Sequence, residues 1–207
     1  MTGKQKTIRG GETGLSSDKP EATKLGWIVT ETHYPVETPW MRLRQDTIAV
    51  ADGTEMKYTY EERAPAIAIV PVTREGIILL IRQYRYVFDT WCLEVPVGGT
   101  HDREGISLEE AARAELHEEI GGTCGHLSFV DSFYQAHAIT DVVFHVFLAT
   151  DVEVNDDPSL EVSERIVLVP TSASEALRLA RGGQIKDSQS SLSLLLCEGL
   201  LQKHGYL

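Results

Sequence analysis

The sequence predicts an α/β protein in which helices cover a mixed β-sheet. Apolar, β-branched runs outnumber the helical patterns, and the two do not alternate strictly, which argues against a doubly wound parallel sheet. Hydrophobic residues make up 42% of the chain and charged residues 24%, as in a soluble globular protein that builds a core. A length of 207 residues suits one ordinary domain with an extension.

The N-terminal part divides by composition. Residues 1–24 are rich in Gly, Ser, Thr, Lys and Glu and have almost no apolar periodicity, so we expect a disordered tail there. Residues 25–62 contain strand patterns and the turn signal Asp52-Gly53, which predict an antiparallel strand extension. The main domain is expected over residues 63–207. The expected strands of the extension are 27–30, 41–44, 46–50 and 55–62.

In the main domain, short apolar runs predict strands and periodic runs predict helices. The expected strands are 66–72, 76–84, 91–96, 127–134, 141–149 and 165–170. A first helix is expected between Ser107, which forms a capping box with Glu110, and the C-terminal signal Gly121. Two further helices are expected at 174–181, capped by Ser174, and at 190–203.

The first helix concentrates negative charge. Glu115, Glu118 and Glu119 fall within five consecutive residues. Side chains three and four residues apart share a helix face, so Glu115 neighbours both of the others. Crowding like charges on one stripe costs stability unless something positive lies there. A hard divalent cation with oxygen ligands is the natural candidate, and we therefore expect a metal ion at this helix.

Composition excludes several classes of function. The net charge of −12 argues against nucleic acid as a partner, because phosphate binding depends on clustered Lys and Arg. No apolar run has the length of a membrane span, and the N-terminus lacks the apolar core of a signal peptide. Three widely spaced cysteines without CxxC spacing indicate a reduced chain, so we expect a cytoplasmic protein. These cysteines are Cys92, Cys124 and Cys197.

The acidic helix also carries a recognisable motif. Gly99, Gly105 and residues 111–121 resemble the Nudix box, the loop–helix–loop signature of hydrolases that act on nucleoside diphosphates linked to another group. Four flanking segments resemble the ADP-ribose pyrophosphatase branch of that family. These segments are 70–72, 80–85, 93–98 and 183–187.

This resemblance implies a fold, a reaction and a metal site. The fold is the α/β/α Nudix sandwich, and the reaction is hydrolysis of the pyrophosphate of ADP-ribose or another ADP-sugar. Glu115, Glu118 and Glu119 are the implied metal ligands, with the backbone carbonyl of Val97 as a further one. Glu118 and Glu119 are also expected to be catalytic. Mg²⁺ is the expected ion and Mn²⁺ the alternative, because a cation must neutralise the pyrophosphate before water can attack it.

A general base is expected in the acidic loop that follows the box. In the ADP-ribose pyrophosphatase branch this base often comes from such a loop. Glu164, directly before the strand 165–170, matches the expected position best, and Glu161 is the alternative. A carboxylate near the attacking water could accept its proton.

Substrate-binding candidates come from two regions. Arg82 and Arg85 lie at the end of a strand, and an arginine fork suits phosphate oxygens. Glu94, in one of the flanking motifs, is a third candidate. Related dimeric ADP-sugar hydrolases stack adenine on aromatic residues of N-terminal strands, and Trp40 is the position we expect to do so here. The resemblance thus implies a homodimer with a small nucleotide-sugar substrate.

Two positions depart from the Nudix pattern. Ala114 stands where the family has an arginine, and Ile106 falls where it has an upstream glutamate. The missing arginine normally orients the metal-binding carboxylates, so their support is weakened. A catalytically weak Nudix-fold nucleotide-binding or regulatory module is therefore the alternative function.

Overall fold

The computed structural model describes residues 19–38, 41–100 and 105–207. The chain forms two compact units. The first comprises Met1–Glu62 with Ala138–Asp141, and the second comprises Arg63–His137 with Val142–Leu207. No helix among the described residues has the length and apolar character needed to cross a membrane.

The first unit is a three-stranded antiparallel sheet with a short helix. The strands β1 (Ile28–Glu37), β2 (Arg42–Ala49) and β3 (Glu55–Glu62) pair in sequence order. The two strands expected at 41–44 and 46–50 form one strand, β2. The Asp52-Gly53 turn joins β2 to β3 as predicted, with Gly53 at a φ of 83° and the Asp52 side chain accepting a hydrogen bond from the Thr54 N–H.

The structure describes the end of the expected disordered tail. Its last residues form α1 (Pro20–Lys24), whose first turn contains Pro20 and Glu21. Proline has a backbone angle already suited to a first helical position, and an acidic side chain there faces the positive end of the helix dipole. The prediction of a structureless segment to residue 24 is therefore wrong for these five residues.

The second unit contains two sheets, one with strand order β10-β5-β6 and one with order β7-β4-β9-β8. Strands β4 and β9 pair in parallel and the other neighbours are antiparallel, so the architecture is mixed as predicted. The strands are β4 (Ala66–Pro71), β5 (Ile77–Arg85), β6 (Thr90–Glu94), β7 (Val97–Gly99), β8 (Gly122–Tyr134), β9 (Val143–Val154) and β10 (Ile166–Ser172). The helices are α2 (Leu108–Ile120), α3 (Ala173–Arg181) and α4 (Ser188–Lys203), with the 3₁₀ turn η1 (Tyr86–Phe88) between β5 and β6.

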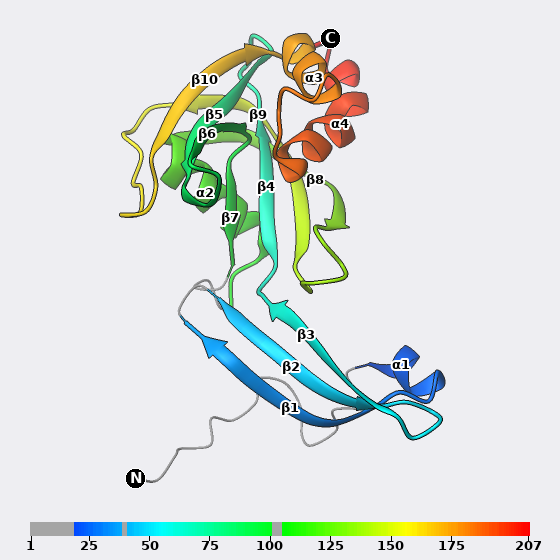
Figure 1. Cartoon of the computed structure of the whole chain (residues 1–207). Helices are drawn as coiled ribbons and strands as arrows, with labels where there is room; N and C mark the ends of the chain where they lie inside the picture. Colours follow the sequence, from blue (N-terminus) through cyan, green and yellow to red (C-terminus); the bar gives the residue numbers. More distant parts are fainter. Residues whose placement is uncertain (1–18, 39–40, 101–104) are drawn as a thin grey trace. The chain divides into compact units, whose positions relative to one another are not determined.

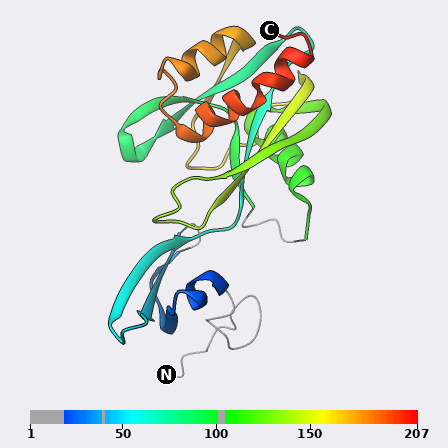
Figure 2. The same cartoon turned by 90° about the vertical axis from the view of Figure 1, so that its right-hand side faces the viewer.

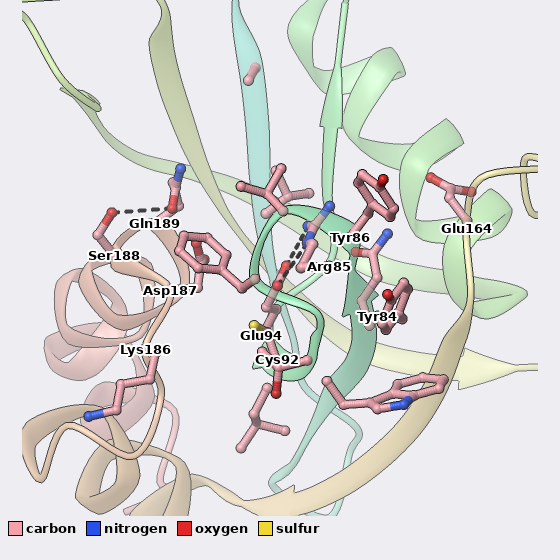
Figure 3. Close-up of a pocket in the computed structure, with 18 of the residues that line it drawn as sticks. Tyr84, Arg85, Tyr86, Cys92, Glu94, Glu164, Lys186, Asp187, Ser188 and Gln189 are labelled. Atoms are coloured by element: carbon pink, nitrogen blue, oxygen red, sulfur yellow. Dashed lines mark hydrogen bonds and ion pairs between the residues drawn. The ribbon is translucent and has the colours of Figure 1, made fainter.

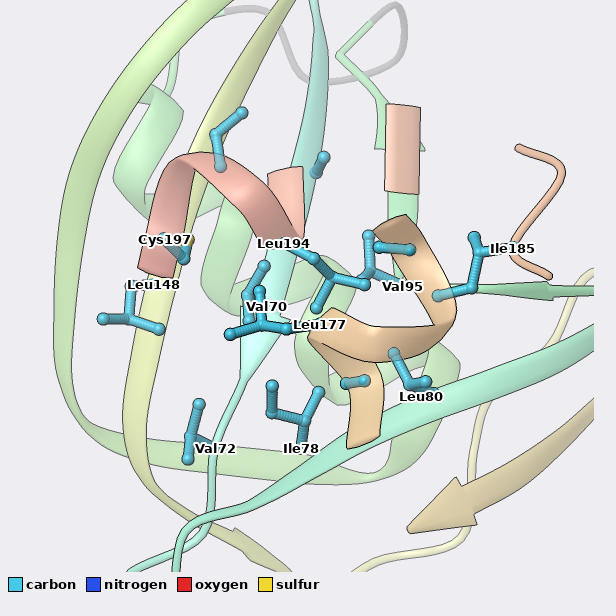
Figure 4. Packing of buried hydrophobic residues seen from close by; sticks show 14 of the residues in the cluster. Val70, Val72, Ile78, Leu80, Val95, Leu148, Leu177, Ile185, Leu194 and Cys197 are labelled. Atoms are coloured by element: carbon cyan, nitrogen blue, oxygen red, sulfur yellow. The ribbon is translucent and has the colours of Figure 1, made fainter. Parts of the chain in front are cut away.

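Helices cover both sides of these strands because β4 and β5 are apolar on both faces. Alternate residues of a strand point to opposite faces. Ile67 and Ile69 of β4 pack in one core with α2, whereas Val70 packs in a second core with α3 and α4. Figure 1 shows α2 on one side and the other two helices on the opposite side, and Figure 2 shows α3 and α4 side by side. Figure 4 shows Val70 in the second core with Leu194.

Capping residues fix where the helices begin. The Ser107–Glu110 capping box of α2 is present, and Gly121 ends the helix in the left-handed conformation, as predicted. Helix α3 starts one residue earlier than expected, and its N-cap residue is Ser172 rather than Ser174, because the side chain of Ser172 accepts a hydrogen bond from the Glu175 N–H. Helix α4 likewise starts earlier, after the N-cap residue Asp187.

Candidate functional site

Helix α2 has two adjacent stripes of buried residues that differ in chemistry. Leu116 and Ile120 lie in the apolar core. Glu115 and Glu119, one turn apart, are only 8% and 3% exposed. The predicted third carboxylate, Glu118, is half-buried. Two acidic side chains are thus removed from water on a helix that the apolar stripe holds against the sheets.

The strand β7 segment lies directly against these carboxylates. The carboxyl group of Glu115 occupies the space where a side chain at residue 98 would begin, because a Cβ on Gly98 would lie 1.8 Å from the Glu115 Cδ. The N–H of Val97 donates a hydrogen bond to Glu119 Oε2 at 3.1 Å. Only glycine at position 98 allows the backbone to approach the Glu115 carboxylate this closely.

Glu119 lies in a concentration of negative charge. Burial raises the pKa of Glu119 well above its usual range, and the charges of Glu115 and Glu164 raise it further. The Val97 N–H and the Arg85 guanidinium oppose this pKa shift. Both carboxylates would be stabilised as anions by a cation between them.

The groups around Glu115 and Glu119 suit a hard divalent ion that is bound partly by backbone oxygen and water, rather than by side chains alone. Within the described ranges, no three His, Cys, Asp or Glu side chains form a metal-binding group. Two buried carboxylates beside the backbone of Val97 and Gly98 suit a hard divalent ion, which prefers oxygen ligands.

A cavity of about 1330 Å³ reaches the same backbone segment. Val97 and Gly98 line it, together with Arg85, Glu94 and Glu164. Figure 3 shows Glu164 on one side of the cavity, the start of α4 on the other, and the Arg85–Glu94 pair between them. The cavity therefore joins a possible base, a guanidinium group and the backbone that contacts the buried carboxylates.

Arg85 is already bound to another candidate residue. Its Nε and Nη2 donate to the two carboxylate oxygens of Glu94, at 2.9 and 2.5 Å. Glu94 is 2% exposed, whereas the Arg85 side chain is 40% exposed. Glu94 thereby fixes the orientation of the guanidinium, and Nη1 takes no part in these two hydrogen bonds.

One predicted substrate contact, Arg82, is not brought to this cavity. Arg82 is exposed and is not among the residues that line it. Residues three apart on a strand point to opposite faces, so Arg82 cannot form a fork with Arg85. Trp40 lies outside the described residues.

Glu164, the first candidate for the general base, lies at the cavity. It is half-buried and lines the cavity, and its charge reaches Glu119. Its Oε2 accepts a hydrogen bond from the Glu161 N–H at 2.8 Å. The alternative, Glu161, is exposed and does not line the cavity.

Residues 62–183, more than half of the chain, match the NUDIX domain family. The chain belongs to the Nudix family. An ADP-ribose pyrophosphatase of Bacillus subtilis (strain 168) is 26% identical over 150 residues, which cover 72% of this chain and 80% of that protein. A CMP-5'-(N-acetyl-N-hydroxy-3-aminopropyl)phosphonate hydrolase of Streptomyces rubellomurinus (strain ATCC 31215) is 30% identical over 159 residues, covering 74% of this chain and 76% of that protein.

The Nudix fold and enzyme class predicted from the sequence are thereby confirmed. The crystal structure of an ADP compounds hydrolase superposes with a TM-score of 0.72 at 19% identity and covers 87% of this chain and 97% of that chain. The chain is a Nudix pyrophosphohydrolase. Nudix hydrolases generally use divalent metal ions, which agrees with the donor set around Glu115 and Glu119.

Of the two departures from the Nudix box, one lies on α2 and the other lies before it. Ala114 is half-buried next to Glu115, and Ile106 is 45% exposed just before the N-cap residue Ser107. Neither side chain can donate a hydrogen bond or bind a cation. The close contact with Gly98 and the Val97 N–H contribute to the orientation of Glu115 and Glu119.

Sequence reasoning missed the aromatic rim of the cavity. Tyr86, Phe88 and Trp91 line it and are 86%, 76% and 50% exposed. The signal was a run of large apolar residues at the tip of a hairpin, where polar turn residues are usual. The turn is held by Asp89, which accepts a hydrogen bond from the Tyr84 hydroxyl at 2.8 Å.

The raised pKa of Glu119 predicts a pH-dependent stability of the metal-free protein. A carboxyl whose folded-state pKa is raised contributes stability below its unfolded pKa, and that contribution is lost as pH rises through the folded pKa. Glu119→Gln should therefore raise Tm at neutral pH, by ~2–4 °C for each kcal/mol relieved, and the gain should vanish towards pH ~4.

Thermal unfolding in excess chelator between acidic and neutral pH measures this difference. Glu153→Gln is the matched control, because Glu153 is an exposed strand carboxylate and its substitution should leave the curve within ~0.5 kcal/mol of wild type. A Glu119→Gln protein that is no more stable than wild type at neutral pH would show that burial of the Glu119 carboxylate does not destabilise the metal-free protein.

Proposed function

We propose that this Nudix hydrolase requires a divalent ion, Mg²⁺ with Mn²⁺ as alternative, and cleaves the pyrophosphate of ADP-ribose or another ADP-sugar. The observation that carries the proposal is the burial of Glu115 and Glu119 against Gly98, beside a cavity lined by Glu164. The pyrophosphatase names of two relatives support the substrate class. The products would be AMP and a sugar phosphate.

The chain's own residues have distinct roles in this proposal. Glu115, Glu119 and the Val97 carbonyl would hold the ion, with Glu118 at the edge of the site. The ion, when bound, neutralises the pyrophosphate oxygens and lowers the pKa of water. The Val97 N–H fixes one oxygen of Glu119, and the Gly98 backbone leaves room for the Glu115 carboxyl group.

Glu164 would act as the general base. It faces the cavity, and its carboxylate is held by the Glu161 N–H. A base at this position accepts the proton of the attacking water while the pyrophosphate lies in the cavity. Arg85, oriented by Glu94, would bind a phosphate oxygen through its remaining edge.

The second candidate function is a nucleotide-binding module with little catalysis. Ala114 and Ile106 favour it, because both lack the charged groups of the Nudix pattern. Binding of ADP-ribose in calorimetry without product after prolonged incubation would support this alternative. Stacking of adenine on Trp40 stays a prediction under either function.

We also propose that the chain is a cytoplasmic homodimer. Ile48 is the sole buried apolar side chain among the described residues of the first unit, and a three-stranded sheet needs an apolar face packed against something. The ion pair between Arg44 and Asp46, at 2.8 Å, is buried in the same sheet. A second copy would supply the missing packing surface. The three free cysteines suit a reducing compartment.

Substitution of the two acidic candidates in the loop tests the assignment of the base. With ADP-ribose and Mg²⁺, Glu164→Gln should lower kcat by about 10²–10⁴-fold, because an amide cannot accept the proton. Glu161→Gln is the matched control and should retain turnover, since its backbone N–H still binds residue 164.

Product formation from ADP-ribose, other nucleotide sugars, dinucleotides and nucleoside triphosphates measures both the rate and the substrate. If Glu161→Gln lost activity and Glu164→Gln retained it, Glu161 rather than Glu164 would be the general base. Turnover of triphosphates alone would contradict the proposed substrate.

The homodimer predicts a specific sedimentation result. The full chain should sediment at twice the mass of one chain over the micromolar range, because the N-terminal sheet lacks a core of its own. Sedimentation velocity at several concentrations, with and without ADP-ribose, makes the measurement. A single species of monomer mass throughout would refute the dimer.

A further inference from the structure

The acidic loop 155–164 completes the C-terminal end of α2. The last carbonyls of a helix have no partners within the helix. Here the Gly121 carbonyl accepts from the N–H groups of Asn155 and Asp156, at 3.1 and 3.3 Å. The Glu118 carbonyl accepts from the Ser159 N–H at 2.8 Å. The loop is therefore bonded to the helix that carries the buried carboxylates.

The backbone of the loop approaches the helix end closely. Gly121 has a φ of 64°, and a Cβ at this position would lie 1.8 Å from the carbonyl oxygen of Asp156. A residue with a side chain would be strained here and would also push the loop away. The contact is specific to one residue of the loop, Asp156.

A side-chain pair binds the same two segments. His117 Nε2 lies 3.2 Å from Asp156 Oδ2, and both side chains are largely accessible, at 48% and 61%. An exposed pair of this kind contributes at most ~1 kcal/mol to stability. The pair instead restricts the geometry of the loop, because it fixes the start of the loop to the exposed side of α2.

The far end of this loop carries Glu164. The Glu164 N–H donates to the Glu161 carbonyl at 3.0 Å, and the Glu161 N–H donates to the Glu164 carboxylate at 2.8 Å. These reciprocal bonds make a compact turn at the cavity. The negative charge of Glu164 is near enough to raise the pKa of Glu119.

We propose that Asp156 is a positioning residue that acts through the loop to place Glu164 relative to Glu115 and Glu119. The proposal rests on the proposed function, in which Glu164 is the base. A misplacement of about 1 Å at a reacting centre can cost about 10²-fold in rate, so a contact of little stability can matter for catalysis. His117 is its partner on α2.

The test compares Asp156→Ala with Asp157→Ala. Asp157 is the adjacent exposed acid, and its side chain makes no hydrogen bond or ion pair within the described part of the chain, so it controls for lost charge. With ADP-ribose and Mg²⁺, Asp156→Ala should lower kcat about tenfold with KM unchanged. Asp156→Asn keeps an oxygen acceptor for His117 and should restore most of kcat.

A double mutant separates positioning from general damage. In the Glu164→Gln background, Asp156→Ala should cause little further loss of kcat, because its effect passes through the base that is already absent. A tenfold loss that persists in this background would overturn the proposal. Equal kcat in Asp156→Ala and Asp157→Ala would overturn it as well.

Hydrogen exchange gives a readout that does not require turnover. The amides of residues 155–164 should exchange faster in Asp156→Ala than in Asp157→Ala, including those at 161–164. Unchanged exchange at 161–164 would refute the positioning role. If the wild-type chain hydrolyses no substrate, the proposed function fails while exchange alone decides whether Asp156 holds the loop.

Discussion

The close contact between the Gly98 backbone and the Glu115 carboxyl group determines the rest of the site. A side chain at residue 98 would overlap the carboxyl, so strand β7 and helix α2 can meet only through glycine. The same approach brings the Val97 N–H to Glu119. Two acids are thereby held away from water, which is unfavourable for the isolated chain and favourable once a cation binds.

Packing on both faces of β4 and β5 supplies the framework for this contact. One core holds α2, and the other holds α3 and α4. Helix α4 is also bonded to the β6–β7 segment, because the Ser190 hydroxyl accepts from the Val95 N–H and donates to Asp187, its own N-cap. Both helical layers thus position the short segment that contains Val97 and Gly98.

The sequence could predict those parts of the fold and site that depend on local signals. The capping box and Gly121 fixed the bounds of α2, and the four-residue spacing placed Glu115 and Glu119 on one face. The start of α3 was missed because Ser172 and Ser174 are both good caps and only the geometry separates them. Helix periodicity alone also could not show that Glu118 stays half-buried.

Features that depend on strand register and on distant segments could not be predicted from the sequence. The Arg85–Glu94 pair joins residues that do not lie opposite each other, because the antiparallel pairing of β5 with β6 places Thr90 opposite Arg85 and Ile81 opposite Glu94. Strand alternation places Arg82 and Arg85 on opposite faces of β5, although their closeness in sequence suggested that both could contact phosphate oxygens. The cavity combines the β5–β6 hairpin, the loop before β10 and the start of α4, and no local pattern encodes that combination.

Calorimetric titration of Mg²⁺ and Mn²⁺ measures the central interaction most directly. The comparison is between the wild-type chain, Gly98→Ala and Gly199→Ala, since a Cβ on Gly199 of α4 would meet no atom within 4 Å. Wild type and Gly199→Ala should bind the cations equally, and Gly98→Ala should bind them about 10–100-fold more weakly because Glu115 is displaced. Equal cation affinity in all three proteins, or no binding by wild type at millimolar metal, would contradict the role assigned to this contact.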